Sequence, residues 1–222
     1  MGSNITLTAS DGHRLNAWRS GPDDAARGLV VVQEIFGVNG HIRAVCERFA
    51  AHGFVVIAPA LFDRVKPGIE LGYTPEAIAE GRELRGKVPD AGAMADVEAA
   101  ARALGGKPLG IVGYCWGGTV AWWGATRTTQ FKGASCWYGG GIAATRTEVP
   151  HCPVQMHFGE QDGGIPMSDV AAIRAAQPGV QVYVYPGAGH GFGCDERGSF
   201  SQTANDLAQQ RTLAFFDEHL KG

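Results

Sequence analysis

Residues 110–119, Gly-Ile-Val-Gly-Tyr-Cys-Trp-Gly-Gly-Thr, limit the possible folds of this chain more than any other segment. The apolar residues before Cys115 are typical of a buried strand, and the residues after it begin a helix, so the chain turns sharply at the cysteine. Gly113 and Gly117 flank it because side chains there would collide with a strained turn. Such a nucleophile elbow exposes the central side chain above a sheet and leaves the next backbone N–H, here that of Trp116, free to bind an oxyanion. A cysteine packed in the core is the structural alternative.

The rest of the chain alternates between short apolar runs and segments of helical periodicity. We expect strands at 3–9, 13–19, 29–32, 54–58, 134–138, 154–158 and 180–185, besides the one before Cys115. We expect helices at 41–52, 75–85, about 93–104, after Cys115, about 167–176 and about 201–219. Asp11-Gly12 joins the first two strands as a hairpin, whereas helices separate the later ones. The pattern predicts one α/β domain over residues 1–222, with a mostly parallel sheet flanked by helices and an N-terminal antiparallel hairpin.

Composition and charge exclude several other classes of protein. Of the 222 residues 45% are hydrophobic, enough for a sizeable core, and the net charge of −3 predicts no binding to nucleic acid or to a membrane surface. No apolar run reaches membrane-spanning length and no signal peptide is evident, so we expect a cytoplasmic protein, as a monomer or small homo-oligomer. The odd number of cysteines and the lack of a C-x-x-C pair predict no disulfide framework. The cysteines are Cys46, Cys115, Cys136, Cys152 and Cys194.

Three chemically suggestive residues follow predicted strands in the order cysteine, aspartate, histidine. Cys115, Asp162 and His190 each fall on a loop at the carboxyl edge of the sheet, where ligands of such sheets bind. Their order is that of α/β hydrolases. A thiol with a pKa of about 8.5 is mostly protonated at pH 7, so it needs a histidine to accept its proton or stabilise the thiolate, and an acid to orient that histidine. Taken alone, Asp162 could form a turn and His190 could be a surface residue.

Glu34 is a fourth candidate. It follows the strand that ends at Val32, which we expect beside the elbow strand, so its carboxylate could meet Cys115. The alternative is a solvated loop glutamate.

Three segments resemble those of the dienelactone hydrolase (carboxymethylenebutenolidase) family. They are 33–39 (Gln-Glu-Ile-Phe-Gly-Val-Asn), 113–118 (Gly-Tyr-Cys-Trp-Gly-Gly) and 187–192 (Gly-Ala-Gly-His-Gly-Phe). The similarity extends over nearly the whole chain, from the hairpin to the last helix. It implies an α/β-hydrolase fold and a hydrolase of the dienelactone type, which opens lactones or cleaves small carboxylic esters through a thioester.

The resemblance also implies roles for individual residues. Cys115, Asp162 and His190 would form the triad, and Glu34 would hydrogen-bond the resting thiol until substrate redirects it to take the proton. The backbone N–H groups of Ile35 and Trp116 would form the oxyanion hole.

The substrate-binding residues are less well matched. Family members carry an arginine four residues after the catalytic histidine, where it grips the substrate carboxylate, and this chain has Cys194 there. Recognition of the same anionic lactone is therefore open. The candidates for substrate contact are Phe36, Arg82, Arg85, Tyr138 and Arg197.

Other features of the sequence suggest different functions. A redox sensor using Cys115 as a reactive thiol is the main alternative, although it would need neither Asp162 nor His190. The glycines after 138 imitate a dinucleotide fingerprint but leave too few residues for a crossover helix. His151, Cys152 and His157 lack the spacing of metal ligands. We therefore expect no cofactor and no metal, and a small lactone or ester as the only partner.

Overall fold

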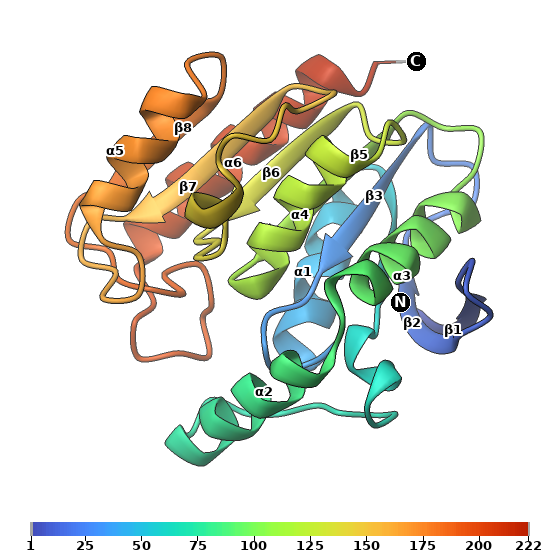
Figure 1. Cartoon of the computed structure of the whole chain (residues 1–222). Coiled ribbons are helices and arrows are strands. Elements are labelled where there is room, and N and C mark those ends of the chain that lie inside the picture. The colour runs from blue at the N-terminus through green and yellow to red at the C-terminus, as the bar shows by residue number, and fades with distance from the viewer. Residues whose placement is uncertain (1, 222) are drawn as a thin grey trace.

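The computed structural model describes residues 2–221, which form an α/β fold around one eight-stranded sheet (Figure 1). The order of the strands across the sheet is β1-β2-β4-β3-β5-β6-β7-β8. The strands are β1 (Ser3–Thr8), β2 (Arg14–Ser20), β3 (Arg27–Val32), β4 (Phe54–Pro59), β5 (Leu109–Tyr114), β6 (Gly133–Trp137), β7 (Val154–Gly159) and β8 (Gln181–Tyr185). β2 pairs antiparallel with both β1 and β4, and all other pairs are parallel. The predicted fold class, an α/β fold with an N-terminal hairpin, is confirmed.

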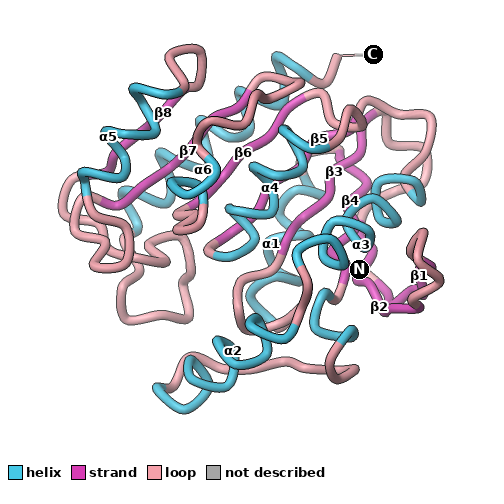
Figure 2. Tube along the Cα trace, in the orientation of Figure 1, coloured by secondary structure: helices cyan, strands magenta, loops and turns pink. Residues whose placement is uncertain are grey.

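Helices cover both faces of the sheet (Figures 1 and 2). The helices are α1 (Gly40–Ala51), α2 (Pro75–Lys87), α3 (Asp90–Ala103), α4 (Trp116–Arg127), α5 (Met167–Ala176) and α6 (Gln202–His219). In the view of Figure 1, α3 and α4 lie in front of the sheet and α1 and α6 behind it. Aromatic contacts of Phe216 with Phe49 and Phe54 join α6 to α1 and β4 on the rear face. Because both faces are covered, β3 and β5 are buried along nearly their whole length, as their continuous apolar runs predict.

The central strands β3 and β5 bring the loop that carries Glu34 close to the turn at Cys115. β3 pairs directly with β5, with Val32 opposite Gly113, so the loop that carries Glu34 begins beside the elbow. The expected neighbourhood of these two strands is confirmed. α2 stands away from the sheet beyond the carboxyl end of β3 (Figure 1), where it covers that loop.

The helix starts follow from side-chain caps. The Asn39 side chain accepts a hydrogen bond from the Ile42 N–H at the start of α1, and the Thr74 hydroxyl accepts one from Ala77 before Pro75 opens α2. Between β4 and α2, where the sequence indicates no strand or helix, the chain forms a short 3-10 helix at Leu61–Arg64, and Glu70 forms an isolated bridge with Gly37. Among residues 2–221, no helix is both long enough and apolar enough to cross a membrane.

Candidate active site

The turn at Cys115 has the strained geometry that the sequence predicts. Cys115 has φ 55° and ψ −119° and stands at the N-terminus of α4, with its side chain half-buried. A Cβ at Gly113 would lie 1.8 Å from the Gly117 carbonyl oxygen, and one at Gly117 would lie 2.3 Å from the Val32 carbonyl oxygen. Side chains at these positions are therefore excluded by backbone atoms, so the predicted steric reason for both glycines is confirmed.

Cys115, His190 and Asp162 form a hydrogen-bonded chain at the carboxyl edge of the sheet. His190 Nε2 lies 3.2 Å from Cys115 Sγ, and His190 Nδ1 lies 2.7 Å from Asp162 Oδ2. The three residues follow β5, β8 and β7, respectively. These strands lie in one half of the sheet, in the order β5-β6-β7-β8. The Gly164 N–H donates to Asp162 Oδ1 at 2.8 Å, so both carboxylate oxygens are engaged. Such a chain can orient an imidazole and move a proton to or from the sulfur.

The charge of His190 is set by its two partners. Burial alone would lower the pKa of His190, but its hydrogen bonds with Asp162 and Cys115 raise the pKa to about 10. At neutral pH the ring is therefore an imidazolium with one N–H directed at the carboxylate and the other at the sulfur.

Glu34 is fully buried next to this chain, but its observed partner differs from the expected one. Glu34 Oε1 lies 3.3 Å from Arg197 Nη1, and within residues 2–221 no hydrogen bond joins Glu34 to Cys115. The expected bond between Glu34 and the resting thiol is thus absent from this arrangement. Burial would lower the pKa of Arg197, whereas the carboxylate raises it, so each charge compensates the other. Gly191, with φ 75°, makes room for the guanidinium: a Cβ there would lie 2.5 Å from Arg197 Nη1.

A cavity of about 320 Å³ opens above the cysteine. Three of the expected substrate contacts, Phe36, Arg82 and Arg197, line it. Its remaining lining residues are Ile35, Ile78, Cys115, Gly164 and His190. The cavity is mainly apolar with cationic groups at its wall, which suits a small organic molecule with an anionic or polar end.

The other two expected contacts lie elsewhere. Tyr138 is fully buried, and its ring centroid lies 5.3 Å from that of His190. It does not line the cavity, so the structure does not place it where a substrate would bind. It is buried because β6 ends directly under the histidine loop. Arg85 lines a neighbouring cavity of about 270 Å³ that also reaches Cys115, where its guanidinium stacks on Trp116 and pairs with Asp90.

The N-terminus of α4 supplies a potential oxyanion donor. As the first residue of this helix, Trp116 has a backbone N–H for which the helix provides no acceptor. Ile35 lines the same cavity, so its backbone could provide the second donor. The assignment of these two groups to an oxyanion hole stays a prediction.

Sequence reasoning missed several residues that shape the site. The Ser199 hydroxyl donates to the His190 carbonyl at 2.7 Å and fixes the histidine loop. Gly164 positions Asp162, and Ile78 closes the cavity from α2. None of these has a distinctive motif in the sequence. Glu34, His41 and Cys194 are the described residues grouped closely enough to hold a metal ion.

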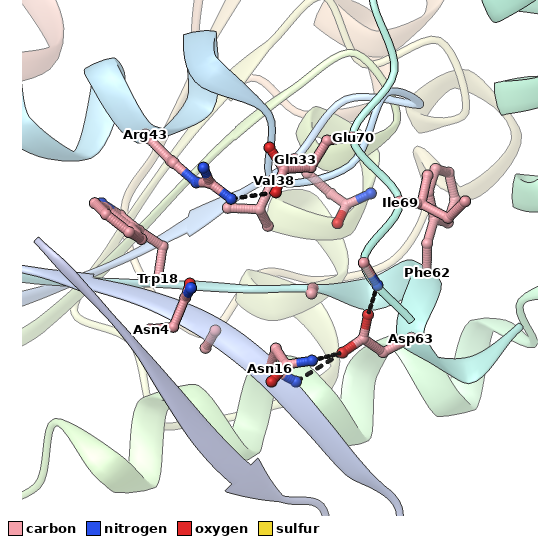
Figure 3. A pocket seen from close by; sticks show the side chains of 13 residues that line it. Asn4, Asn16, Trp18, Gln33, Val38, Arg43, Phe62, Asp63, Ile69 and Glu70 are labelled. Atoms are coloured by element: carbon pink, nitrogen blue, oxygen red, sulfur yellow. Dashed lines mark hydrogen bonds and ion pairs between the residues drawn. The ribbon is translucent and has the colours of Figure 1, made fainter. Parts of the chain in front are cut away.

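A second cavity, of about 210 Å³, lies on the other side of the loop that carries Glu34 (Figure 3). Several of its polar groups are paired with one another: Asp63 accepts hydrogen bonds from Asn16 and the Gly68 N–H, and Arg43 pairs with Glu70. Cys115, His190 and Asp162 do not line it, so we place the chemistry in the other cavity.

Comparison with known proteins gives one consistent family. The sequence model of the dienelactone hydrolase family matches residues 15–220. A "Putative carboxymethylenebutenolidase" from Synechocystis sp. is 39% identical over 213 residues, covering 87% of this chain and 86% of the relative. One from Salmonella typhimurium is 34% identical, covering 99% and 88%. The crystal structure of a putative dienelactone hydrolase from Klebsiella pneumoniae is 33% identical, with a TM-score of 0.81 over 97% of this chain and 99% of that one.

Proposed function

Because this chain belongs to the dienelactone hydrolase family and is a carboxylic ester or lactone hydrolase, we propose that it works through a Cys115–His190–Asp162 triad and a thioester intermediate. The observation that carries the proposal is the unbroken chain from Cys115 Sγ to His190 Nε2 at 3.2 Å and from His190 Nδ1 to Asp162 Oδ2 at 2.7 Å, at the floor of a cavity. Each link has the length and the chemistry that nucleophilic catalysis requires.

In the first half of the reaction, the sulfur attacks the substrate carbonyl carbon. The negative charge that develops on the carbonyl oxygen would be held by the N–H groups of Trp116 and Ile35. Collapse of the tetrahedral intermediate breaks the bond to the leaving oxygen and leaves an acyl group on Cys115. A lactone stays attached through the acyl group after its ring opens.

Proton transfers complete the cycle. The imidazolium of His190 lies where it can give its proton to the leaving oxygen, and an enol leaving group from a dienelactone needs little help because its anion is stabilised by conjugation. The neutral ring then takes a proton from water as the water attacks the thioester. Collapse of the second tetrahedral intermediate breaks the carbon–sulfur bond, which releases the acid and returns the sulfur to the enzyme. Asp162 holds the same tautomer throughout both halves.

The substrate class follows from the arginines of the cavity. Arg197 and Arg82 line it, and a guanidinium binds a carboxylate with two parallel hydrogen bonds. The relatives are named as carboxymethylenebutenolidases, so we propose a small lactone that bears a carboxylate as the preferred substrate. Arg197 would take the place of the arginine that the family carries at position 194. Substrate carboxylate bound to Arg197 would compete with Glu34 and free that glutamate to act on the thiol.

The test is turnover of p-nitrophenyl acetate and of a dienelactone by the protein and by Cys115→Ala. We expect loss of at least a thousandfold in kcat for Cys115→Ala, because no other group can form the thioester. Cys152→Ala, which removes a half-buried thiol outside the site, should turn over normally. Full activity in Cys115→Ala would refute the mechanism. A Cys115 that is readily oxidised in a protein without turnover would favour the redox-sensing alternative.

A further inference from the structure

Three side chains with metal-binding atoms meet behind the catalytic cysteine. Glu34 comes from the loop after β3, His41 from the first turn of α1, and Cys194 from the loop after His190. One ligand atom from each lies within 4.8 Å of the others, and all three residues are fully buried. The proposed hydrolysis uses Glu34, but it leaves His41 and Cys194 without a role.

His41 is held in the arrangement that metal-binding histidines adopt. Its Nδ1 lies 3.0 Å from Asp195 Oδ1, whereas its Nε2 is buried and has no hydrogen-bond partner. A hydrogen on Nδ1 that is donated to the carboxylate leaves a lone pair on Nε2. A carboxylate behind the distal nitrogen is the usual means by which proteins orient such a ligand and increase its basicity.

The other two ligands are also available. Glu34 uses Oε1 for Arg197, and its Oε2 is buried without a partner, so it can bind an ion without breaking the ion pair. The Cys194 thiol is buried and forms no disulfide, so its proton is what an ion has to displace. An ion would replace that proton, which leaves to solvent as the sulfur–metal bond forms.

We propose that Glu34, His41 and Cys194 bind a borderline divalent ion such as Zn²⁺, and that the bound ion inhibits hydrolysis by taking the carboxylate of Glu34. Thiolate, imidazole and carboxylate together select zinc or cobalt over magnesium and calcium. Ligand atoms around tetrahedral zinc lie about 3.5 Å apart, so a small inward movement of these side chains closes the site. The binding itself is independent of the proposed function, whereas the inhibition rests on it.

Cobalt provides a direct test of the ligands. After treatment with EDTA, Cys115→Ser protein, which lacks the nucleophilic thiol, is titrated with Co²⁺. We expect one equivalent to produce the thiolate-to-cobalt charge-transfer absorption, and Zn²⁺ to remove it. Double variants that combine Cys115→Ser with Cys194→Ala or with His41→Gln should lose the band or show it strongly weakened. The control double variant, Cys115→Ser with Cys152→Ala, should show the band unchanged.

Inhibition is measured separately on protein that retains Cys115. Zn²⁺ should inhibit ester hydrolysis reversibly, with recovery on EDTA, and Cys194→Ala should keep the basal rate but need at least tenfold more Zn²⁺. A cobalt band that survives without Cys194 overturns the site. Zinc inhibition that is unchanged in Cys194→Ala overturns it as well and assigns the ion to Cys115 and His190. If the protein hydrolyses no ester, the cobalt spectra still decide the site, so the two failures are distinguishable.

Discussion

At the scale of single residues, the contact between Cys115 and His190 decides the reactivity of the thiol. The imidazolium of His190, with its pKa near 10, faces the sulfur at 3.2 Å and is backed by Asp162. The raised pKa means that the positive charge persists from acidic pH up to about pH 10. Over that range a positive charge faces the Cys115 sulfur, and above it this charge is lost.

The pH dependence of alkylation checks this pair. In His190→Ala no imidazolium faces the sulfur, so labelling of Cys115 by iodoacetamide should slow more steeply between pH 8.5 and pH 6.5 than it does in the parent protein. In the parent protein, labelling should vary little over this interval because the imidazolium is already formed. Mass spectrometry of the labelled peptide gives the rate at Cys115 alone. The same slope in both proteins would show that His190 does not control the thiol.

Arg197 should set a preference for anionic substrates. We expect carboxylate-bearing lactones or esters to be favoured over matched neutral ones, and Arg197→Met to reduce that preference about ten- to a hundredfold, the usual worth of a charge-assisted pair. Because Arg197 also compensates Glu34, the informative quantity is the ratio of kcat/KM for the two substrates within each protein. Arg82→Met tests the second arginine of the same cavity, and a larger fall in the ratio there would assign the carboxylate to Arg82. The opposing expectation is that Asp195 and Glu196 repel anions, and a ratio near one in the parent protein would support it.

Some of these residues could be predicted from the sequence and others could not. Cys115, Asp162, His190 and Glu34 were identified because each follows a strand, and parallel strands all end at one edge of the sheet. The partner of Glu34 was not identified. Arg197 lies in the loop between β8 and α6, which has no periodicity, so nothing in the sequence indicates that this part of the loop folds back over Glu34.

The proposed metal ligands show the same limit. Glu34, His41 and Cys194 are too far apart along the chain to form a recognisable spacing, and the sequence therefore predicted no metal site. Only the meeting of the β3 loop, the first turn of α1 and the histidine loop brings them within 4.8 Å of one another. Non-local clusters of this kind depend on tertiary packing rather than on local pattern.

At the scale of elements, α2 fixes the position of the loop that carries Ile35. Gly81, near the middle of the helix, faces this loop, and a Cβ there would lie 2.1 Å from the Ile35 carbonyl oxygen. Gly86 lies on the same helix, and a Cβ there would meet nothing within 4 Å. The two glycines therefore form a matched pair, because only one of them contacts the site.

Gly81→Ala should displace the Ile35 loop and reduce kcat/KM at least tenfold, since the new methyl group cannot avoid backbone atoms. Gly86→Ala should leave kcat unchanged and stabilise the protein by about 0.5–1 kcal/mol, the normal gain for alanine in a helix. Ester turnover and thermal unfolding of both variants provide the comparison. Equal activity of the two variants would mean that the position of Ile35 is unimportant for the reaction.

Most elements could be predicted because their periodicity is clear. The runs at 29–32 and 54–58 are continuous and apolar, which indicates strands buried on both faces, and Thr74-Pro75 marks the start of α2. The short helix at Leu61–Arg64 and the bridge from Gly37 to Glu70 could not be predicted. Each is too short to produce a periodic pattern and is fixed by contacts with distant strands.

At the scale of the whole molecule, His157 links three elements in the interior. It lies on β7, fully buried, with Nδ1 2.7 Å from the Tyr185 hydroxyl of β8 and Nε2 3.3 Å from the Thr212 hydroxyl of α6. Burial and the nearby charge of Arg211 lower the pKa of His157 to about 3. The folded protein therefore contains a neutral histidine over nearly the whole range of pH in which it is stable.

This histidine should make the fold sensitive to acid. In the unfolded chain His157 titrates near pH 6.5, whereas in the folded chain it does so only near pH 3, so between these values the unfolded state binds the additional proton. Its contribution to stability is complete above pH 6.5 and is lost as pH falls, at about 1.4 kcal/mol per unit, or about 2 kcal/mol by pH 5. The free energy of unfolding, measured with urea, should fall between pH 7 and pH 5 in both proteins. The fall should be about 2 kcal/mol smaller in His157→Gln than in the parent protein. Replacement of the exposed His52 by glutamine is the control and should leave the loss unchanged. An equal loss in His157→Gln would show that His157 does not set the acid limit of the fold.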